Sequence, residues 1–436
     1  MQRILYFCLL VISFPLFAAN DKPLMRLHGS NTIGSELAPD LVMSWLQHEG
    51  YYNVQKLVMA AESIEIRAID GSGKLATVEI QSHGSGTGFT SIAQGTTDIA
   101  MSSRAITMDE LDKLADFGDL SSHKAEYIIG MDGIAVIVNK KNTLRSLEKP
   151  TLAKIFSGEI RDWNQIDAGM HGAINVYARD NNSGTYDTFK SLVLGNNTLI
   201  PSARRYESST QLSDDVAKDA SAIGFIGLPY VRQARALAIA EPGAIARYPE
   251  VFEVATEDYP LSRRLYMYVP SVSENKYAEH FMRFVMSGQG QALVQHSGFV
   301  SQTIMAQAVD LDRGLPDEYL QFTQNSERLS LNIRFRKGSV QVDTKAQHDL
   351  ERLVEYMKAA TNRGKKLLLF GFSDETRSLP EYGEDLATHR VDRVADLLIN
   401  QGLDPIRVRA YGSANPVASN DDVGRLKNRR VEVWVQ

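Results

Sequence analysis

The chain has 436 residues, and its 47 Lys+Arg and 53 Asp+Glu give a formal net charge of −6. This balance excludes a protein that attracts anions through bulk charge, so an anion would have to be bound by local, aligned donors. Nucleic-acid binding is also excluded, because no long basic stripe with interleaved aromatic residues is present. The length predicts more than one domain.

The first 19 residues have the layout of a secretory signal peptide. Arg3 precedes an apolar run over residues 4–17, and the small residues Ala18 and Ala19 follow it. The run is shorter than the roughly 20 residues that a membrane span needs. We therefore expect cleavage and a periplasmic protein associated with the cell wall and the outer membrane, with an uncleaved anchor as the alternative. Cys8, the only cysteine, lies in this run, so we expect neither a disulfide nor a lipid anchor in the mature protein.

Four strand-like segments in the first half of the chain run into turns rich in Ser, Thr, Gly or Arg. The turns follow the segments at residues 24–27, 78–80, 97–101 and 173–178. In open α/β sheets, ligands bind outside the carboxyl ends of the strands. Repetition of the same turn chemistry therefore favours one shared binding site.

The most informative turn is Arg179-Asp180-Asn181-Asn182-Ser183-Gly184-Thr185. Its last three residues open a helical pattern, and a helix start offers backbone N–H groups and the positive end of the helix dipole. Arginine can hold two oxygens at once, and glycine permits close approach of the backbone. The turn predicts an oxyanion site; the alternative is an ordinary capped helix with an arginine nearby.

Residues 24–302 resemble the phosphate-binding periplasmic proteins of phosphate ABC importers, the PstS-like family. The motifs that carry the resemblance are Gly29-Ser30-Asn31-Thr32, Gly84-Ser85-Gly86-Thr87-Gly88, residues 132–139, residues 155–164, Arg179 with Ser183-Gly184-Thr185, residues 223–230, residues 288–293 and residues 298–300. The resemblance implies an α/β fold of the type II periplasmic-binding-protein class. Two lobes would be joined by crossing strands with hinges near residues 133–138 and 255–268, and the ligand would lie between them.

The resemblance also implies the phosphate-binding residues. They are Ser30, Asn31, Thr32, Ser85, Ser103, Arg104, Arg179, Ser183, Gly184 and Thr185. One position departs from the family, because Ser103, followed by Arg104, stands where better-known members have an aspartate that accepts the proton of hydrogen phosphate. Asp180 either takes over that role or caps the helix. We expect phosphate as the ligand, with sulfate or another tetrahedral oxyanion as the alternative.

The composition and periodicity of the sequence change near residue 302, which indicates that a second domain follows. The sequence predicts a two-lobed domain over residues 20–304, a helical or irregular connector over 305–328, and a small α+β domain over 329–436. In the last part, Leu331, Ile333 and Phe335 alternate as in a strand, and later apolar residues recur at helical spacing. The expected order is strand, helix, strand, helix, strand, strand, in about 105 residues.

Residues 329–436 resemble the OmpA-like peptidoglycan-binding domain. The resemblance runs through Phe335, Gly371-Phe372-Ser373-Asp374, Leu386, Arg390 and Val394, Tyr411-Gly412, Asn415-Pro416 and residues 428–432. It implies that Asp374 and Arg390 bind the ammonium and carboxylate of the diaminopimelate stem of peptidoglycan. The chain departs from the family at Gly383, Ala387 and Val391. The alternative for Arg390 is a solvated helix charge, and for Arg429 and Arg430 it is a surface pair beside the last strand.

No pattern indicates catalysis. The expected mature chain has no cysteine, its histidines lack metal-ligand spacing within one helix, and Ser85 does not stand in a Gly-x-Ser-x-Gly turn. We therefore predict a binding protein that is not an enzyme and has no cofactor or metal. Its expected partners are inorganic phosphate, peptidoglycan, and an ABC permease or a membrane sensor. A structural or adhesive wall protein is the alternative.

Overall fold

The computed structural model describes residues 22–436 apart from 36, 61, 182, 272, 274, 310–314, 337–338, 375–379 and 421–423, and apart from the side chains of 380–385. The signal peptide expected over residues 1–19 lies outside the described residues. Among the described helices, none combines the length and the apolar character that crossing a bilayer requires.

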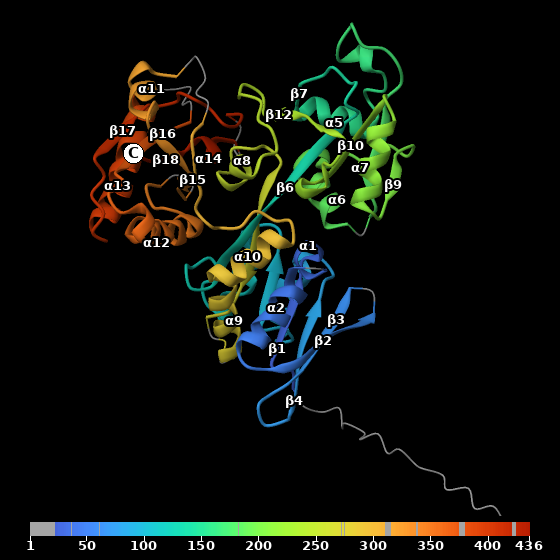
Figure 1. Ribbon diagram of the computed structural model, residues 1–436, viewed down its shortest axis with the longest axis vertical. Helices are drawn as coiled ribbons and strands as arrows, with labels where there is room; N and C mark the ends of the chain where they lie inside the picture. The colour runs from blue at the N-terminus through green and yellow to red at the C-terminus, as the bar shows by residue number, and fades with distance from the viewer. Residues whose placement is uncertain are drawn as a thin grey trace, which may run out of the picture.

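The N-terminal part of the chain folds into two lobes (Figure 1). Lobe one has a sheet in which β1 runs parallel to both β4 and β5. Its strands are β1 (Met25–Gly29), β2 (Tyr52–Ala60), β3 (Ser63–Ile69), β4 (Leu75–Gln81), β5 (Ile99–Ser102) and β13 (Ser262–Tyr268). Its helices are α1 (Asn31–Gly34), α2 (Leu37–His48), α3 (Ser85–Ala93), α4 (Met108–Lys113), α9 (Lys276–Met286) and α10 (Gly288–His296). Helix α2 buries Leu37, Leu41 and Trp45, a spacing of four residues that places all three on one face.

Lobe two is a second α/β unit, in which β8 runs parallel to its neighbours β9 and β10. Its strands are β7 (Ser146–Glu148), β8 (Asn175–Arg179), β9 (Arg204–Tyr206), β10 (Ala222–Gly227), β11 (Arg235–Ala236) and β12 (Ala238–Ala240). Its helices are α5 (Lys149–Ser157), α6 (Gly184–Phe189) and α7 (Ser209–Lys218). Phe189 stacks on Phe225 with ring centroids 3.9 Å apart, which joins α6 to the sheet.

One long strand, β6 (Glu126–Val138), belongs to both lobes. Residues 126–133 pair with β13 of lobe one, and residues 134–138 pair with β10 of lobe two. The change of partner between Gly133 and Ile134 lies at the start of the hinge expected at residues 133–138. The chain returns from lobe two through α8 (Val251–Ala255) and residues 256–261 into β13.

The C-terminal domain has a five-stranded sheet in the order β14-β15-β18-β16-β17. Its strands are β14 (Ala306–Gln307), β15 (Glu327–Arg334), β16 (Leu367–Phe372), β17 (Arg407–Ala410) and β18 (Arg430–Val435), and its helices are α11 (Asp317–Thr323), α12 (Thr344–Lys358), α13 (Pro380–Ile399) and α14 (Gly424–Asn428). The two-lobed fold followed by a small α+β domain, predicted from the sequence, is confirmed.

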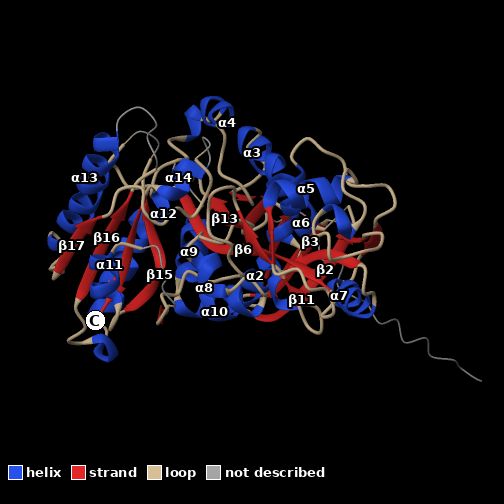
Figure 2. Cartoon of the chain, turned by 90° about the horizontal axis from the view of Figure 1, so that it is seen from above, coloured by secondary structure: helices blue, strands red, loops and turns tan. Residues whose placement is uncertain are grey.

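Helices cover both faces of the C-terminal sheet (Figure 2). Leu353 of α12 and Val394 of α13 pack on one face, and Tyr319 of α11 packs on the other against Phe370 and Trp434. The stretch expected as a connector thus contributes elements to this domain: β14 pairs with β15, and α11 buries its tyrosine in the second core.

The C-terminal domain is joined to the lobes by buried charges. Three residues of the return segment, 256–258, form the junction loop. Arg328 Nη2 donates to Asp258 Oδ2 at 2.8 Å, and Asn332 Nδ2 donates to Asp258 Oδ1 at 2.9 Å. Arg334 Nε lies 3.1 Å from Glu257 Oε2. All three partners come from β15, so one strand of the C-terminal sheet clamps the junction loop.

The charges of the junction loop are strongly perturbed. Burial by itself raises the pKa of Glu257, but Arg264 and Arg334 outweigh burial and lower this pKa to about 2. Arg328 likewise holds the pKa of Asp258 well below its usual value in spite of burial. Glu257 also has a φ of 63°, in the left-handed region that a glutamate rarely adopts, and its ion pairs hold it there.

We expect Asp258→Asn to destabilise the folded chain by about 3 kcal/mol, because the substitution removes one of the two carboxylates that neutralise the buried Arg328, the other being Glu432 at 3.4 Å. Urea unfolding of the full chain at neutral pH measures the change. The matched control is Glu279→Gln, which breaks an ion pair with Arg283 whose side chains are 73% and 69% exposed and should change stability by less than about 0.5 kcal/mol. Equal effects of the two substitutions would contradict the junction as a stabilising contact.

The pKa of Glu257 predicts how stability depends on pH. A carboxyl whose folded pKa is lowered stabilises the fold above its unfolded pKa of about 4.3, and this contribution is lost as pH falls toward the folded value of about 2. The gap in urea midpoint between the natural chain and Glu257→Gln should therefore be constant from about pH 7 to 5 and shrink below about pH 4. A gap that stays constant down to pH 3 would argue against this assignment.

Candidate functional site

A cavity of about 830 Å³ lies between the two lobes. Its lining includes Thr32, Asp132, Arg179, Ser183, Gly184 and Thr185, together with residues 207–210 and 297–299. Five of the ten site residues expected from the sequence therefore face one space: Thr32, Arg179, Ser183, Gly184 and Thr185.

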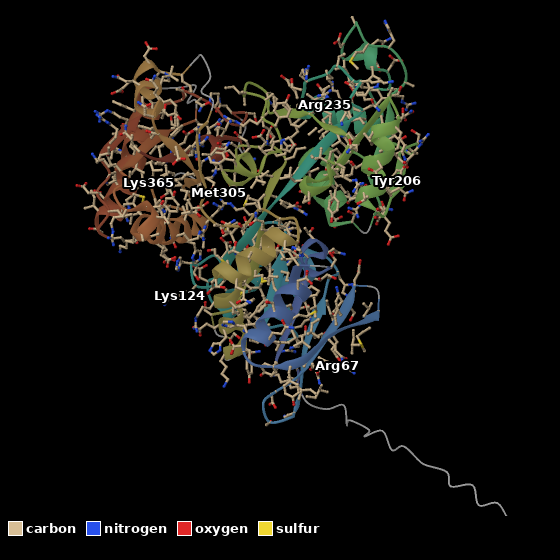
Figure 3. The ribbon with its side chains drawn as sticks, viewed as in Figure 1. Arg67, Lys124, Tyr206, Arg235, Met305 and Lys365 are labelled. Carbon is tan, nitrogen blue, oxygen red and sulfur yellow. The ribbon has the colours of Figure 1, made fainter. Side chains whose placement is uncertain are left out.

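Arg179 is the last residue of β8 and forms part of the cavity wall. Its guanidinium donates from Nε to the carbonyl of Tyr206 at 3.2 Å, from Nη2 to the carbonyl of Glu207 at 2.8 Å and from Nη1 to Ser209 Oγ at 2.5 Å. Tyr206 lies in lobe two (Figure 3). Arg179 therefore fixes the loop after β9 and at the same time presents a cation to the cavity.

The lobes touch at the floor of the cavity. A Cβ placed on Gly184 would lie 2.3 Å from Thr32 Oγ1 and 2.7 Å from Thr32 Cα, so only glycine allows α6 to approach α1 this closely. Arg263 of β13 joins the same point, because its Nη2 donates to Thr32 Oγ1 at 2.7 Å and to the Gly184 carbonyl at 3.0 Å. One guanidinium thus bridges the two lobes.

Asp132 holds Arg263 from the crossing strand. Its Oδ2 lies 3.3 Å from Arg263 Nε and accepts from the hydroxyl of Thr188 at 3.1 Å. Burial lowers the pKa of Arg263, although Asp132 opposes that shift. Sequence reasoning missed both residues as part of the site. The available signal was charge within two largely apolar strands: Asp132 in β6, which also has Glu126 at its start, and Arg263 in β13, which is followed by Arg264.

Two expected site residues have buried hydroxyls whose partner is missing among the described residues: Ser30 Oγ and Ser183 Oγ. Ser183 precedes α6 and lines the cavity. A buried hydroxyl without a hydrogen bond is costly, and a bound oxyanion would accept the bond that Ser183 leaves unmade.

The remaining expected residues lie at the other strand ends of lobe one, outside the lining of this cavity. Ser85 Oγ accepts from the Ser103 backbone N–H at 3.0 Å and lies 3.3 Å from Ser103 Oγ. Asn31 Nδ2 donates to Glu62 Oε1 at 2.9 Å. Ser85 and Ser103 form one hydroxyl pair, although β1 separates the strands β4 and β5 that precede them, and Asn31 is bound to a carboxylate.

Arg104 has a different environment from the one expected of a ligand. It donates from Nη1 and Nη2 to the two carboxylate oxygens of Glu110 at 2.8 and 2.7 Å. Glu110 is also the third residue of the capping box that begins at Thr107, so local structure fixes its position. Its hydrogen bond raises the pKa of Arg104. The second arginine that the sequence offered to the anion is engaged by a carboxylate in this structure.

In the C-terminal domain, Asp374 follows β16 and pairs with an arginine other than Arg390. Arg429 Nε and Nη2 donate to the two Asp374 oxygens at 2.6 and 2.9 Å. This ion pair lowers the pKa of Asp374 against the opposing effect of burial. Arg429 is thus tied to the site that the resemblance implies.

Arg390 is buried, which excludes the alternative of a solvated helix charge. It lies over the ring of Phe335 at 5.4 Å, and its Nη1 has no partner among the described residues. Burial and the neighbouring Arg429 lower its pKa to about 10. Arg430 is also fully buried, where it pairs with Glu432 at 2.8 Å, so Arg429 and Arg430 are not a surface pair.

Comparisons with known proteins agree with this division of the chain. Residues 67–289 match the model of the PBP superfamily domain, and residues 334–430 match that of the OmpA family. The phosphate-binding protein PstS of Staphylococcus epidermidis is 29% identical over 239 residues, which cover 52% of this chain and 72% of the relative.

Solved structures resemble the two-lobed part. The crystal structure of a possible phosphate binding protein from Planctomyces limnophilus has a TM-score of 0.51 at 19% identity, covering 69% of this chain and 95% of that one. An ABC-type phosphate transport receptor from Vibrio cholerae has a TM-score of 0.49 at 24% identity, covering 63% of this chain and 99% of that one. The family match spans half of the chain: the protein belongs to the PBP superfamily and carries an OmpA family domain at its C-terminal side.

Proposed function

We propose that the chain is a periplasmic solute-binding protein that holds inorganic phosphate between its lobes and is tethered to peptidoglycan by its C-terminal domain. It would bind without catalysing a reaction and would serve phosphate uptake through an ABC permease or sensing through a membrane partner. The observation that carries the proposal is the shared wall of the cavity, where the Arg179 guanidinium and the Ser183 hydroxyl lie beside Thr32 and Gly184, and where that hydroxyl has no hydrogen-bond partner in the described part of the chain.

The donors suit a small oxyanion. A guanidinium can hold two oxygens of one anion, and the start of α6 supplies backbone N–H groups beside Ser183. Since the net charge of the chain is −6, these local donors rather than the overall field would have to select the ion. The relatives from Staphylococcus are phosphate-binding proteins, which supports phosphate as the ion.

Acceptors in the same cavity favour phosphate over sulfate. Asp132, Asp180 and Glu207 line the space. Near neutral pH phosphate carries a proton that a carboxylate can accept, whereas sulfate has no proton to donate and would be repelled. Asp132 or Asp180 would thereby fill the role of the aspartate that Ser103 replaces.

The proposal includes closure of the lobes over the ion. Bending of β6 where it changes partner, and of the return segment before β13, would carry the Ser85–Ser103 pair toward Arg179. The hydroxyls of lobe one would then complete the shell that Arg179 and Ser183 begin.

We expect Arg179→Ala to weaken phosphate binding by about 100-fold or more, because it removes two charge-assisted hydrogen bonds of about 1.5–3 kcal/mol each. Arg179→Lys keeps the charge without the planar fork and should bind with intermediate affinity. Isothermal titration of the full chain with phosphate, arsenate and sulfate measures both effects and the preference among the anions.

The matched control for Arg179 is Arg232→Ala, which removes an exposed arginine of lobe two that pairs with Asp214 away from the cavity lining. It should leave the phosphate affinity unchanged. Retained affinity in Arg179→Ala would refute the proposed cradle. Absence of heat with every anion would favour the alternative of a wall-attached structural or adhesive protein.

Wall attachment rests on Asp374, Arg429 and Arg390. A carboxylate next to a buried guanidinium can bind the ammonium and the carboxylate of one zwitterionic group, and Arg390 Nη1 has no hydrogen bond to any residue that the structure describes. The diaminopimelate stem of peptidoglycan offers that combination, which supports it as the ligand of the OmpA family domain.

We expect Asp374→Asn and Arg390→Ala each to release the protein from purified peptidoglycan sacculi, measured by co-sedimentation, because each removes one charge of the proposed pair. Arg393→Ala is the control, since Arg393 is exposed on the same helix, α13, and should leave binding intact. Circular dichroism checks the fold of the Arg390 variant. Unchanged sedimentation of both folded variants would overturn the tether while leaving phosphate binding untouched.

A further inference from the structure

Two histidines and a glutamate meet where the C-terminal domain contacts lobe one. His123 comes from the segment before β6, and His348 and Glu351 lie three residues apart on α12. His123 Nε2 lies 3.1 Å from Glu351 Oε1, and His348 Nδ1 lies 3.5 Å from Glu351 Oε2. Lys124, the residue after His123, is labelled in Figure 3 and shows where this group lies, between lobe one and the C-terminal domain.

The imidazoles of this group are close but incompletely paired. Their rings stack with centroids 4.1 Å apart, and Tyr127 also stacks on His348 at 5.7 Å. His348 Nε2 is buried and lacks a hydrogen-bond partner among the described residues, and His123 Nε2 contacts Glu351 without the geometry of a hydrogen bond. An imidazole nitrogen that is buried without a partner is costly, and a metal ion would use its lone pair.

An ion can reach this group from the solvent. The carboxylate of Glu351 supplies a negative ligand, and its side chain is 57% exposed, which leaves the group accessible to an ion and to water.

The ligand types indicate which ion fits. One ligand atom from each of the three residues lies within 4.8 Å of the other two. In a tetrahedral zinc site with bonds of about 2.0–2.1 Å, ligand atoms are about 3.3 Å apart, so small side-chain rotations would close the group. Two imidazoles and a carboxylate suit Zn²⁺ with water as a fourth ligand, whereas Mg²⁺ and Ca²⁺ prefer oxygen ligands only.

We propose that His123, His348 and Glu351 form a Zn²⁺ site that links lobe one to the C-terminal domain. The ion would reinforce a contact that already exists there, in which the Thr344 hydroxyl donates to the carbonyl of Ser121 at 3.3 Å. Because the ligands come from both parts of the chain, zinc binding would stabilise their docked arrangement over any arrangement that separates them.

The test is titration of the EDTA-treated full chain with ZnCl₂, followed by isothermal calorimetry and by thermal unfolding. We expect one Zn²⁺ per chain and a rise in Tm, with no heat from MgCl₂. His123→Ala, His348→Ala and Glu351→Gln should each lower the zinc affinity by about tenfold or more and reduce the rise in Tm.

His171→Ala is the matched control, because His171 is an exposed histidine of lobe two and should leave zinc binding unchanged. Glu351→Gln changes an exposed side chain and should not disturb folding, so it tests the proposal even if a histidine variant fails to fold. Absence of zinc binding by the natural chain, or equal zinc affinity in the natural chain and the folded variants, would overturn the proposal.

Discussion

The arrangement of the two parts of the molecule depends on a carboxylate-rich loop that strand β15 encloses. Asp258 is fully buried, and Arg328 and Asn332 together bond both of its oxygens. A buried charge is tolerated only when it is paired and hydrogen-bonded, so the loop and the strand require one another. The loop lies between α8 and β13, on one of the routes by which the chain passes between the lobes. The C-terminal domain is therefore fixed to the region that would bend if the lobes close.

The cavity between the lobes also contains a buried charge that is paired within the protein. At its floor, Arg263 is shared by Asp132, Thr32 and the Gly184 carbonyl, so its charge is fully used within the protein. Elsewhere in the wall, Ser183 has a hydroxyl whose partner is missing among the described residues, and Arg179 lines the cavity while its guanidinium is held by Tyr206, Glu207 and Ser209. The charges of the cavity are thus positioned by the protein itself, and a bound ligand would complete the bond of the Ser183 hydroxyl.

Sequence patterns predicted those features that repeat or follow strand ends. The turns after β1 and β8 do converge at Thr32 and Gly184. The apolar alternation of Leu331, Ile333 and Phe335 does mark a strand that is buried on that face, although β15 ends at Arg334, one residue before Phe335. For the other face of this strand, the same alternation predicts exposure to water, and that prediction is wrong. Arg328, Asn332 and Arg334 occupy the positions that normally face water, yet all three are buried against the junction loop. Periodicity distinguishes the two faces of a strand, but it does not reveal what covers the polar one. Arg104 was expected to bind the anion, and its pairing with Glu110 was not predicted, because it depends on the capping box of Thr107 and Glu110, which places the carboxylate within reach.

The polar junction contributes more to fixing one relative orientation of the C-terminal domain and the lobes than to the free energy of their contact. Apolar side chains of similar volume could hold the same surfaces together about as firmly, because much of the attraction between buried charges is spent on removing them from water. They would also allow the surfaces to slide, whereas the ion pair of Arg334 with Glu257 is lost when Glu257 moves by more than a hydrogen-bond length. The C-terminal domain contacts the lobes at two separate points. One is the set of ion pairs between β15 and the junction loop, and the other is the group of His123, His348 and Glu351. Two separated, directional contacts fix an orientation as well as a position. A domain bound to a rigid wall would thus hold the opening of the cavity in a constant direction.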